Sequence, residues 1–217
     1  MSPVIHLCVR DVHTGVMQYT RNPPLEDGSL LPDPLAQLQV WLADARRVGM
    51  VEPDAMTLAT ADAQGRPSAR VVLLKGFHDG GLCFYTRYDG RKGLELNTNP
   101  HAAATFWWDQ LERQVRVEGT TERLPRDITR RYFESRPRES QLGALTSRQS
   151  RVVATRAELD ARLHANTKKL EGQPVPLPEE WGGYVLHPQR IEFWQGRLGR
   201  LHDRLRYRRD GNAWVIE

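Results

Sequence analysis

The residues best suited to chemistry in this 217-residue chain lie close together between positions 192 and 204. Trp194, Arg200, His202 and Arg204 fall within eleven positions, with two glycines between them. An aromatic ring, fixed cations and an imidazole can together hold a flat, anionic cofactor or substrate. The same composition also fits an edge hairpin with a solvated basic face, because arginine is mostly a surface residue. Residue types alone leave both interpretations open.

Two further pairs of cations could each bind a phosphate. Arg70 and Lys75 flank an apolar, strand-like run, and their odd spacing of five places them on opposite faces of a regular strand. They would therefore contact different phosphates, or different parts of one ligand. Arg91 and Lys92 begin a short predicted helix behind a glycine, where free N–H groups attract anions. Ordinary strand-end and helix-start cations remain the alternative for both pairs.

A third group combines two hydroxyls with a guanidinium. Tyr132 and Arg136 are four apart and share a face of a predicted helix, and Ser140 follows just past Pro137. Charge-assisted donors of this kind suit a phosphate monoester. The sequence contains neither GxGxxG nor GxxxxGK[ST], so we expect a small-ligand phosphate site rather than a dinucleotide or nucleoside triphosphate fold.

The elements that must position these residues are predicted to be short strands joined by glycine-rich turns. Such a meander favours an antiparallel sheet or barrel over βαβ units, so the expected fold class is mainly β, a barrel with flanking helices. We expect strands over residues 56–60, 68–75, 82–86, 101–108 and 112–123, with a final set that begins at Trp181.

Helices are predicted where the apolar spacing changes to three and four. Asp89 is the candidate N-cap of the shortest of them. The predicted helices run from Asp33 to Gly49, over residues 89–97, from Pro125 to about Arg136, and over residues 155–170. Proline and glycine breakers within residues 1–33 indicate an N-terminal arm that lies over the body or over a partner subunit. Residues 34–217 read as one domain.

Composition places the chain among ordinary globular proteins. A hydrophobic content of 39% with six Trp, six Tyr and five Phe is enough for a core. The net charge of +4 suits phosphate-bearing small ligands as well as nucleic acid. Cys8 and Cys83 show no metal-ligand spacing, so we predict no metal site, and Cys83 should be a buried thiol. No signal-like or membrane-length apolar run occurs, so we expect a cytoplasmic protein without a membrane partner.

The motifs follow one another in a characteristic order. They are ARVVLLK (69–75), FYT (84–86), RKG (91–93), ERQVRVEG (112–119), YFESRPRESQLG (132–143), RQSR (148–151), WGGY (181–184), EFWQG (192–196) and RLHDR (200–204). This ordered set, from about Leu35 to Trp214, closely resembles the pyridoxamine (pyridoxine) 5′-phosphate oxidase family. The resemblance implies an FMN-binding split barrel of antiparallel, Greek-key-like strands in residues 34–217, and a homodimer with FMN at the subunit interface.

The resemblance also assigns residues by matching position. Those implied to bind FMN are Arg70, Val71, Val72, Leu73, Leu74, Lys75, Tyr85, Thr86, Arg91, Lys92, Gln114, Gln149, Ser150, Trp194 and Arg204. Those implied to bind the substrate 5′-phosphate are Lys75, Tyr132, Arg136 and Ser140. Arg200, Leu201 and His202 are implied to lie over the pyridine ring, with Arg200 and His202 as the catalytic pair.

The implied activity is the FMN-dependent oxidation of pyridoxamine 5′-phosphate and pyridoxine 5′-phosphate to pyridoxal 5′-phosphate. A hydride equivalent leaves C4′ for the flavin, and O₂ then reoxidises the flavin and gives H₂O₂. Arg200 can hydrogen-bond the substrate or cover it. The imidazole of His202 can bind or relay a proton.

The chain departs from the family pattern at both ends. The best match to the segment that closes over the substrate is VMQY (16–19), which lacks the family's arginine before the tyrosine. The sequence stops three residues after Trp214, without the family's Arg-Leu-x-Pro end, which predicts a shortened final strand.

Three alternatives keep some of these features. A related flavin-barrel oxidase of the phenazine type would use another substrate, although RLHDR (200–204) and the phosphate-binding trio argue against it. A non-catalytic FMN or pyridoxal-phosphate carrier would bind without turnover. A basic RNA-binding domain would fit the charge, but no aromatic RNA-reading motif supports it, so no nucleic-acid partner is expected.

Overall fold

The computed structural model describes residues 19, 22–26 and 28–217. Most of the predicted arm, Cys8 included, lies outside these residues. Within them the chain forms nine antiparallel strands, five α-helices and two 3₁₀ turns. The strands are β1 (Ala55–Ala61), β2 (Pro67–Leu73), β3 (Phe77–His78), β4 (Gly81–Arg87), β5 (His101–Trp108), β6 (Arg113–Arg123), β7 (Trp181–Gln195), β8 (Asp203–Asp210) and β9 (Ala213–Ile216). The helices are α1 (Pro34–Arg47), α2 (Arg91–Thr98), α3 (Arg126–Ser135), α4 (Arg138–Thr146) and α5 (Arg156–Lys169), and the 3₁₀ turns are η1 (Asp109–Leu111) and η2 (Leu198–Arg200).

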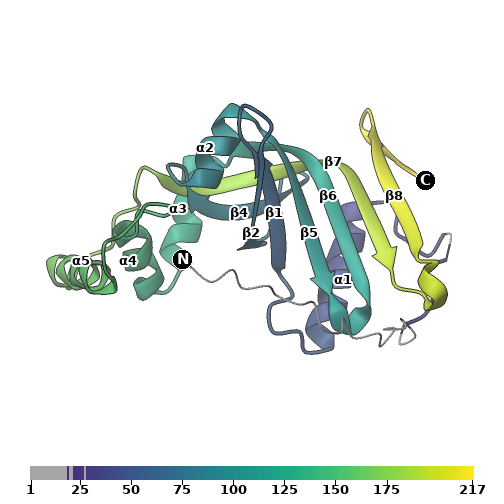
Figure 1. Cartoon of the computed structure of the whole chain (residues 1–217), viewed down its shortest axis with the longest axis horizontal. Helices are drawn as coiled ribbons and strands as arrows, with labels where there is room; N and C mark the ends of the chain where they lie inside the picture. The colour runs from purple at the N-terminus through teal and green to yellow at the C-terminus, as the bar shows by residue number, and fades with distance from the viewer. Residues whose placement is uncertain (1–18, 20–21, 27) are drawn as a thin grey trace, which may run out of the picture.

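The strands form one curved sheet in the order β2-β1-β5-β6-β7-β4-β3. Neighbours such as β1 with β5 and β7 with β4 are not consecutive, as expected of a Greek-key-like arrangement. Strand β7 is long enough to join two regions: residues 181–186 pair with β4, and residues 190–195 pair with β8. In Figure 1 the helices α3 to α5 gather at one end of the molecule, and β8 lies at the other end.

The core lies between α1 and the inner face of the sheet. Leu38, Trp41, Leu42 and Ala45 of α1 are buried, which confirms the predicted apolar face. Trp41 contacts Phe193 edge-on, with ring centroids 5.0 Å apart. Alternation along β5 buries every second residue, so the intervening side chains point away from this core.

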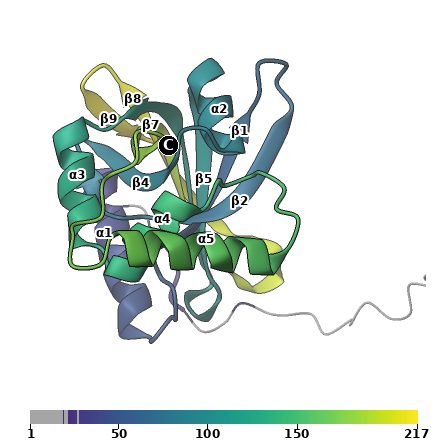
Figure 2. The same cartoon turned by 90° about the vertical axis from the view of Figure 1, so that its left-hand side faces the viewer.

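A second apolar cluster holds the helical end together. Phe133, Leu142, Val175 and Trp181 join α3 and α4 to the start of β7. Figure 2 shows α5 crossing in front of α4 at this end. No residue of α5 is buried, so this helix contributes a solvated surface rather than core. In the described part of the chain, no helix is long and apolar enough to span a membrane.

Most of the predicted elements are confirmed within a few residues. Asp33 caps α1 by accepting a hydrogen bond from the Leu35 N–H, and Cys83 is buried, as predicted. The Asp89 N-cap is wrong: Gly90 occupies that position, and Asp89 instead accepts hydrogen bonds from Arg87. Helix α4 was not predicted. Beyond β9, backbone hydrogen bonding to β8 continues through Glu217, whose N–H donates to the Arg206 carbonyl.

Candidate active site

A cavity of about 350 Å³ opens between β2, β4 and the helical end of the molecule. Backbone hydrogen bonds between Lys75 and Cys83, and between Cys83 and Gly76, fix the segment that follows β2 against β4. Fourteen residues line the cavity: Val71, Val72, Leu73, Lys75, Tyr85, Thr86, Arg87, Lys92, Tyr132, Arg136, Ala144, Ser147, Gln149 and Trp181. Strand pairing and helix packing thus bring together residues that are up to 110 positions apart.

The lining of this cavity is cationic. It contains Lys75, Arg87, Lys92 and Arg136, and none of its fourteen residues, all of them described, is acidic. Arg87 is neutralised by ion pairs with Asp89 at 2.7 Å and Glu180 at 3.8 Å. The other three cations have no such pair among the described residues, so the cavity suits an anionic ligand.

Arg136 is the lining residue whose hydrogen bonding best indicates what the cavity binds. Its Nη1 is buried and has no hydrogen-bond partner among the described residues. Burial lowers the pKa of Arg136, although a guanidinium stays charged at neutral pH. A buried donor without a partner is costly, and a phosphate oxygen in the cavity would remove that cost.

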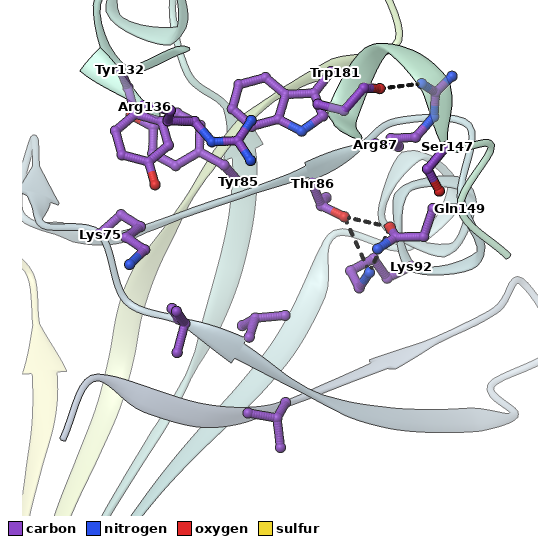
Figure 3. Close-up of a pocket in the computed structure, with 14 residues that line it drawn as sticks. Lys75, Tyr85, Thr86, Arg87, Lys92, Tyr132, Arg136, Ser147, Gln149 and Trp181 are labelled. Carbon is purple, nitrogen blue, oxygen red and sulfur yellow. Dashed lines mark hydrogen bonds between the residues drawn. The ribbon is translucent and has the colours of Figure 1, made fainter. Parts of the chain in front are cut away.

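An aromatic wall holds Arg136 in place. Tyr85 stacks on Tyr132 with ring centroids 3.7 Å apart, and on Trp181 at 5.5 Å. The Arg136 guanidinium lies 4.8 Å from the centroid of Trp181. Burial raises the pKa of Tyr85 to about 12, so this phenol stays protonated and uncharged. Figure 3 shows this wall on one side of the cavity, with Lys75 beside it.

A polar triangle forms another side of the cavity. The Lys92 ammonium donates to Thr86 Oγ1 at 3.1 Å and to Gln149 Oε1 at 3.0 Å, and Thr86 also donates to Gln149. Lys92 is buried, and this burial, with the nearby charge of Arg70, lowers the pKa of its ammonium group. Beside the triangle, Ser150 Oγ accepts a hydrogen bond from the Arg91 N–H.

Arg70 lies outside this cavity, in a network centred on Glu95. Its guanidinium hydrogen-bonds Thr60 at 2.5 Å and also Ser68, and it lies 3.4 Å from the Glu95 carboxylate. Arg91 reaches the same carboxylate at 2.9 Å. Arg70 and Lys75 are thus separated, but not by the alternation of one regular strand as the spacing assumed, because β2 ends at Leu73, before Lys75.

A second polar group lies at the far end of β7. Gln114, Trp194 and Arg204 are directly opposite one another on β6, β7 and β8. The Trp194 ring lies 4.5 Å from the His202 ring and 5.6 Å from the Tyr19 ring. Arg204 pairs with the Glu192 carboxylate at 2.6 Å.

A backbone hydrogen bond in the loop between β7 and β8 fixes the tautomer of neutral His202. The backbone N–H of Arg197 donates to His202 Nδ1 at 3.1 Å, so the neutral imidazole carries its proton on Nε2. Arg200 has a left-handed φ of 63°, a conformation that is uncommon and costly for a non-glycine residue. Leu201 is 84% exposed.

Within one chain these two groups are separate. Trp181 and Trp194 stand near opposite ends of β7, where the strand pairs with β4 and with β8, respectively. Of the residues assigned by resemblance, the cavity brings together Val71, Val72, Leu73, Lys75, Tyr85, Thr86, Lys92, Tyr132, Arg136 and Gln149. Those that do not line it are Arg70, Leu74, Arg91, Gln114, Ser140, Ser150, Trp194, Arg200, Leu201, His202 and Arg204.

Four lining residues were not assigned from the sequence: Arg87, Ala144, Ser147 and Trp181. Trp181 reaches the cavity through its pairing with Arg87 across β4 and β7, a contact between residues 94 positions apart. Ala144 and Ser147 enter on and just after the unpredicted α4. Of these four residues, only Trp181 belongs to a motif that the sequence analysis singled out, WGGY (181–184).

The chain is similar to known proteins over most of its length. Residues 42–166 match the family model described as pyridoxamine 5′-phosphate oxidase, and residues 181–217 match the pyridoxine 5′-phosphate oxidase C-terminal dimerisation region. Pyridoxine/pyridoxamine 5′-phosphate oxidase of Rubrobacter xylanophilus is 54% identical over 205 residues, which cover 94% of each chain. The enzyme of that name from Deinococcus deserti is 50% identical and covers 95% of this chain and 97% of its own.

A solved structure gives the same picture of the fold. The crystal structure of PhzG from Burkholderia lata 383, in complex with tetrahydrophenazine-1-carboxylic acid, superposes with a TM-score of 0.86 at 31% identity. The match covers 92% of this chain and 98% of PhzG, and it confirms the predicted antiparallel split barrel. Because the two family models match residues 42–166 and 181–217 and the relatives are about half identical almost end to end, the protein belongs to the pyridoxamine 5′-phosphate oxidase family.

Proposed function

We propose that this protein is an FMN-dependent oxidase that converts pyridoxamine 5′-phosphate and pyridoxine 5′-phosphate into pyridoxal 5′-phosphate, with O₂ reduced to H₂O₂. With the amine substrate, water is also consumed and ammonia is released. The observation that carries the proposal is the cationic cavity, in which the buried Arg136 Nη1 has no partner among the described residues. The relatives that bear the oxidase name, at about half identity, support the same conclusion.

The residues of the cavity fit two anionic ligands. Lys75 and Arg136 can hold the substrate 5′-phosphate with the Tyr132 hydroxyl, since all three line one region of the cavity. Lys92, Thr86 and Gln149 form a separate donor-rich group that suits the flavin. Arg70, Arg91 and Ser150 lie next to that group and suit the FMN phosphate. Ser140 lies in the first turn of α4, and its role remains a prediction.

We also infer that a second copy of the chain completes the site. The matched dimerisation region, residues 181–217, contains Trp194, His202 and Arg204. These side chains are too far along β7 to reach the cavity of their own chain, but a twofold partner could present them to it. FMN would then lie at the interface, between the cavity of one chain and the β6–β8 face of the other.

Residues of the chain then have separate roles in the reaction. When bound, FMN supplies the acceptor for the hydride equivalent that leaves C4′. Lys75 and Arg136 fix the phosphate and thereby orient C4′. His202 presents an N–H at Nε2, so its neutral form is a hydrogen-bond donor to the substrate rather than a base at that atom. Arg200, fixed in a strained backbone conformation on an exposed turn, can cover the pyridine ring.

The test is oxygen uptake by the FMN-loaded protein with matched substrates. Pyridoxine 5′-phosphate and pyridoxamine 5′-phosphate should each give pyridoxal 5′-phosphate with stoichiometric H₂O₂, and pyridoxine without the phosphate should be a far poorer substrate. Turnover of a dihydrophenazine in preference to both would show the phenazine-type alternative. Tight binding without turnover would show a carrier, and either result would refute the proposed activity.

A further inference from the structure

An aromatic residue with no assigned role extends the β6–β8 face. Trp107 on β5 stands directly opposite Gln114, which stands opposite Trp194, which in turn stands opposite Arg204. Directly opposed residues of an antiparallel sheet point to the same face. The four side chains therefore form one row across four strands, on the side away from the core that holds Phe106.

Of the two tryptophans in this row, Trp107 is the more exposed. Its side chain is 45% exposed, whereas the neighbouring Phe106 and Trp108 are almost fully buried. The Trp107 ring contacts the Trp194 ring, with centroids 5.9 Å apart and planes tilted by 57°. Tyr19 and His202 also contact Trp194. The aromatic surface thus continues from His202 across Trp194 to Trp107.

Along the row of paired strands, Gln114 stands between Trp107 and Trp194. Gln114 and Trp194 are both assigned to the flavin by resemblance, so a ring system that contacts both reaches toward Trp107. A single exposed tryptophan is ordinary. One that continues a surface proposed for a planar aromatic ligand has a specific use, because offset stacking between aromatic rings adds to the gain from burial.

We propose that Trp107 is a further contact for the isoalloxazine ring of FMN and contributes directly to cofactor affinity. This inference rests on the proposed function, which supplies the cofactor. In the dimer, the Trp107 of one chain would serve the cofactor held in the cavity of the other. The competing explanation is that Trp107 only packs against Trp194 and keeps that ring in place.

A double-mutant cycle separates the two explanations. Apoprotein is titrated with FMN, and the quenching of flavin fluorescence gives Kd for the wild type, Trp107→Leu, Trp194→Leu and the double variant. Leucine keeps an apolar side chain and removes the ring. Trp214→Leu is the matched control, since Trp214 is a partly exposed tryptophan on β9 that packs against Tyr207.

Trp107→Leu should raise the Kd for FMN about 3- to 10-fold in the wild-type background. It should also raise Kd at least about 3-fold in the Trp194→Leu background. Trp214→Leu should leave Kd unchanged, and thermal melts should show all variants folded. Trp107→Phe, which keeps a smaller ring, should recover most of the affinity.

Two results would overturn the inference while leaving the proposed function intact. Equal Kd for wild type and Trp107→Leu would show that Trp107 does not serve the flavin. Equal Kd for Trp194→Leu and the double variant would show that Trp107 acts only through Trp194. A wild-type apoprotein that does not bind FMN would refute the proposed function itself, and this inference with it.

Discussion

Arg136 is the side chain whose surroundings say most about the ligand. It is held over Trp181, and its Nη1 has no partner among the described residues. Arg136→Ala should raise KM for pyridoxine 5′-phosphate about 10- to 100-fold, because charge-assisted hydrogen bonds contribute about 1.5–3 kcal/mol. Steady-state kinetics would measure this. Turnover of unphosphorylated pyridoxine should hardly change.

Arg156→Ala is the matched control for that variant. Arg156 lies on the solvated helix α5 and pairs with Asp160 at 2.8 Å, away from the cavity. Its loss should leave both substrates unaffected. An equal effect of Arg136→Ala on phosphorylated and unphosphorylated substrates would mean that the guanidinium has a structural role and does not bind the phosphate.

Single residues were predictable where they lie close together in the chain. Tyr132 and Arg136 both line the cavity, but Arg136 is the C-cap of α3 with extended backbone, so a shared helix face does not explain why the two residues meet there. Ser140 does not line it, because Pro137 both follows α3 and begins α4, which turns Ser140 onto a separate helix. Trp181 could not be inferred from spacing, because only the long-range pairing of β4 with β7 brings it to Tyr85.

Helix α2 is anchored to the sheet by the carboxylate of Glu95. Burial alone would raise the pKa of Glu95, but hydrogen bonds from Thr60, Ser68 and Arg91 outweigh it and lower the pKa to about 2. Since the folded-state pKa is below the ordinary value of 4.5, this carboxylate stabilises the fold above that pH. That stabilisation is lost as the pH falls from 4.5 toward 2.

Glu95→Gln should therefore lower the free energy of unfolding at pH 7 by about 1–3 kcal/mol. The difference in unfolding free energy between the wild type and Glu95→Gln should shrink as the pH falls from 4.5 toward 2. In that range the wild-type Glu95 becomes protonated and its charge no longer stabilises the fold. Urea denaturation at several pH values would measure it. Glu158→Gln, which removes an exposed pair with Arg162 on α5, should cost at most about 0.5 kcal/mol. A pH-independent deficit for Glu95→Gln would contradict this account.

A bulge interrupts the pairing of β6 with β7, where Gln189 of β7 is left over between Arg190 and Pro188, and a glycine of β6 lies beside it. The register between β6 and β7 shifts at Glu118/Gly119, and a Cβ on Gly119 would collide with the backbone carbonyl of His187. Gly119→Ala should thus destabilise the fold by about 1–3 kcal/mol. Gly143→Ala is the control: Gly143 lies within α4 with open space around it, so alanine there should be neutral or stabilising by about 0.5–1 kcal/mol. Thermal denaturation would compare the two, and equal stability would refute the close approach.

Elements with strong alternation were predictable, and those defined by competing side-chain contacts were not. The alternation of polar and apolar residues in the predicted strand 112–123 reproduces β6, because Val115, Val117 and Gly119 face the buried side. Asp89 looked like an N-cap, but the guanidinium of Arg87 competes for its carboxylate. This bond, with burial opposing it, lowers the pKa of Asp89. The tendency of aspartate to cap a helix does not take into account a competing side chain such as that of Arg87.

At the scale of the whole molecule, the site should require two chains. A 1:1 mixture of Arg136→Ala and Arg200→Ala chains, dissociated and reassembled, produces heterodimers in which one site carries both changes and the other carries neither. Roughly a quarter of the sites should then be intact, and activity should recover accordingly above that of either variant alone. No recovery would place the cavity and the β7–β8 loop of one site on the same chain.

The overall fold was predictable because the ordered motifs span most of the chain, and the family match now confirms it. The separation of residues 192–204 from the cavity within one chain could not be read from residue types and spacing, although the resemblance implied FMN at a subunit interface. Residues 192–204 alone fitted either a site or a solvated hairpin, and in the structure they do not line the cavity of their own chain. Spacing along a sequence cannot reveal which groups meet only across a subunit interface.

The central claim, that the cavity holds a flavin next to a phosphorylated B6 vitamer, is tested most directly by anaerobic mixing. FMN-loaded protein is mixed with pyridoxine 5′-phosphate without oxygen while the visible flavin absorption is followed. The band should bleach by one flavin per pyridoxal 5′-phosphate formed, and it should return when oxygen is admitted, with H₂O₂ released. A flavin band that stays unchanged with both phosphorylated substrates, in protein that has bound FMN, would contradict the account.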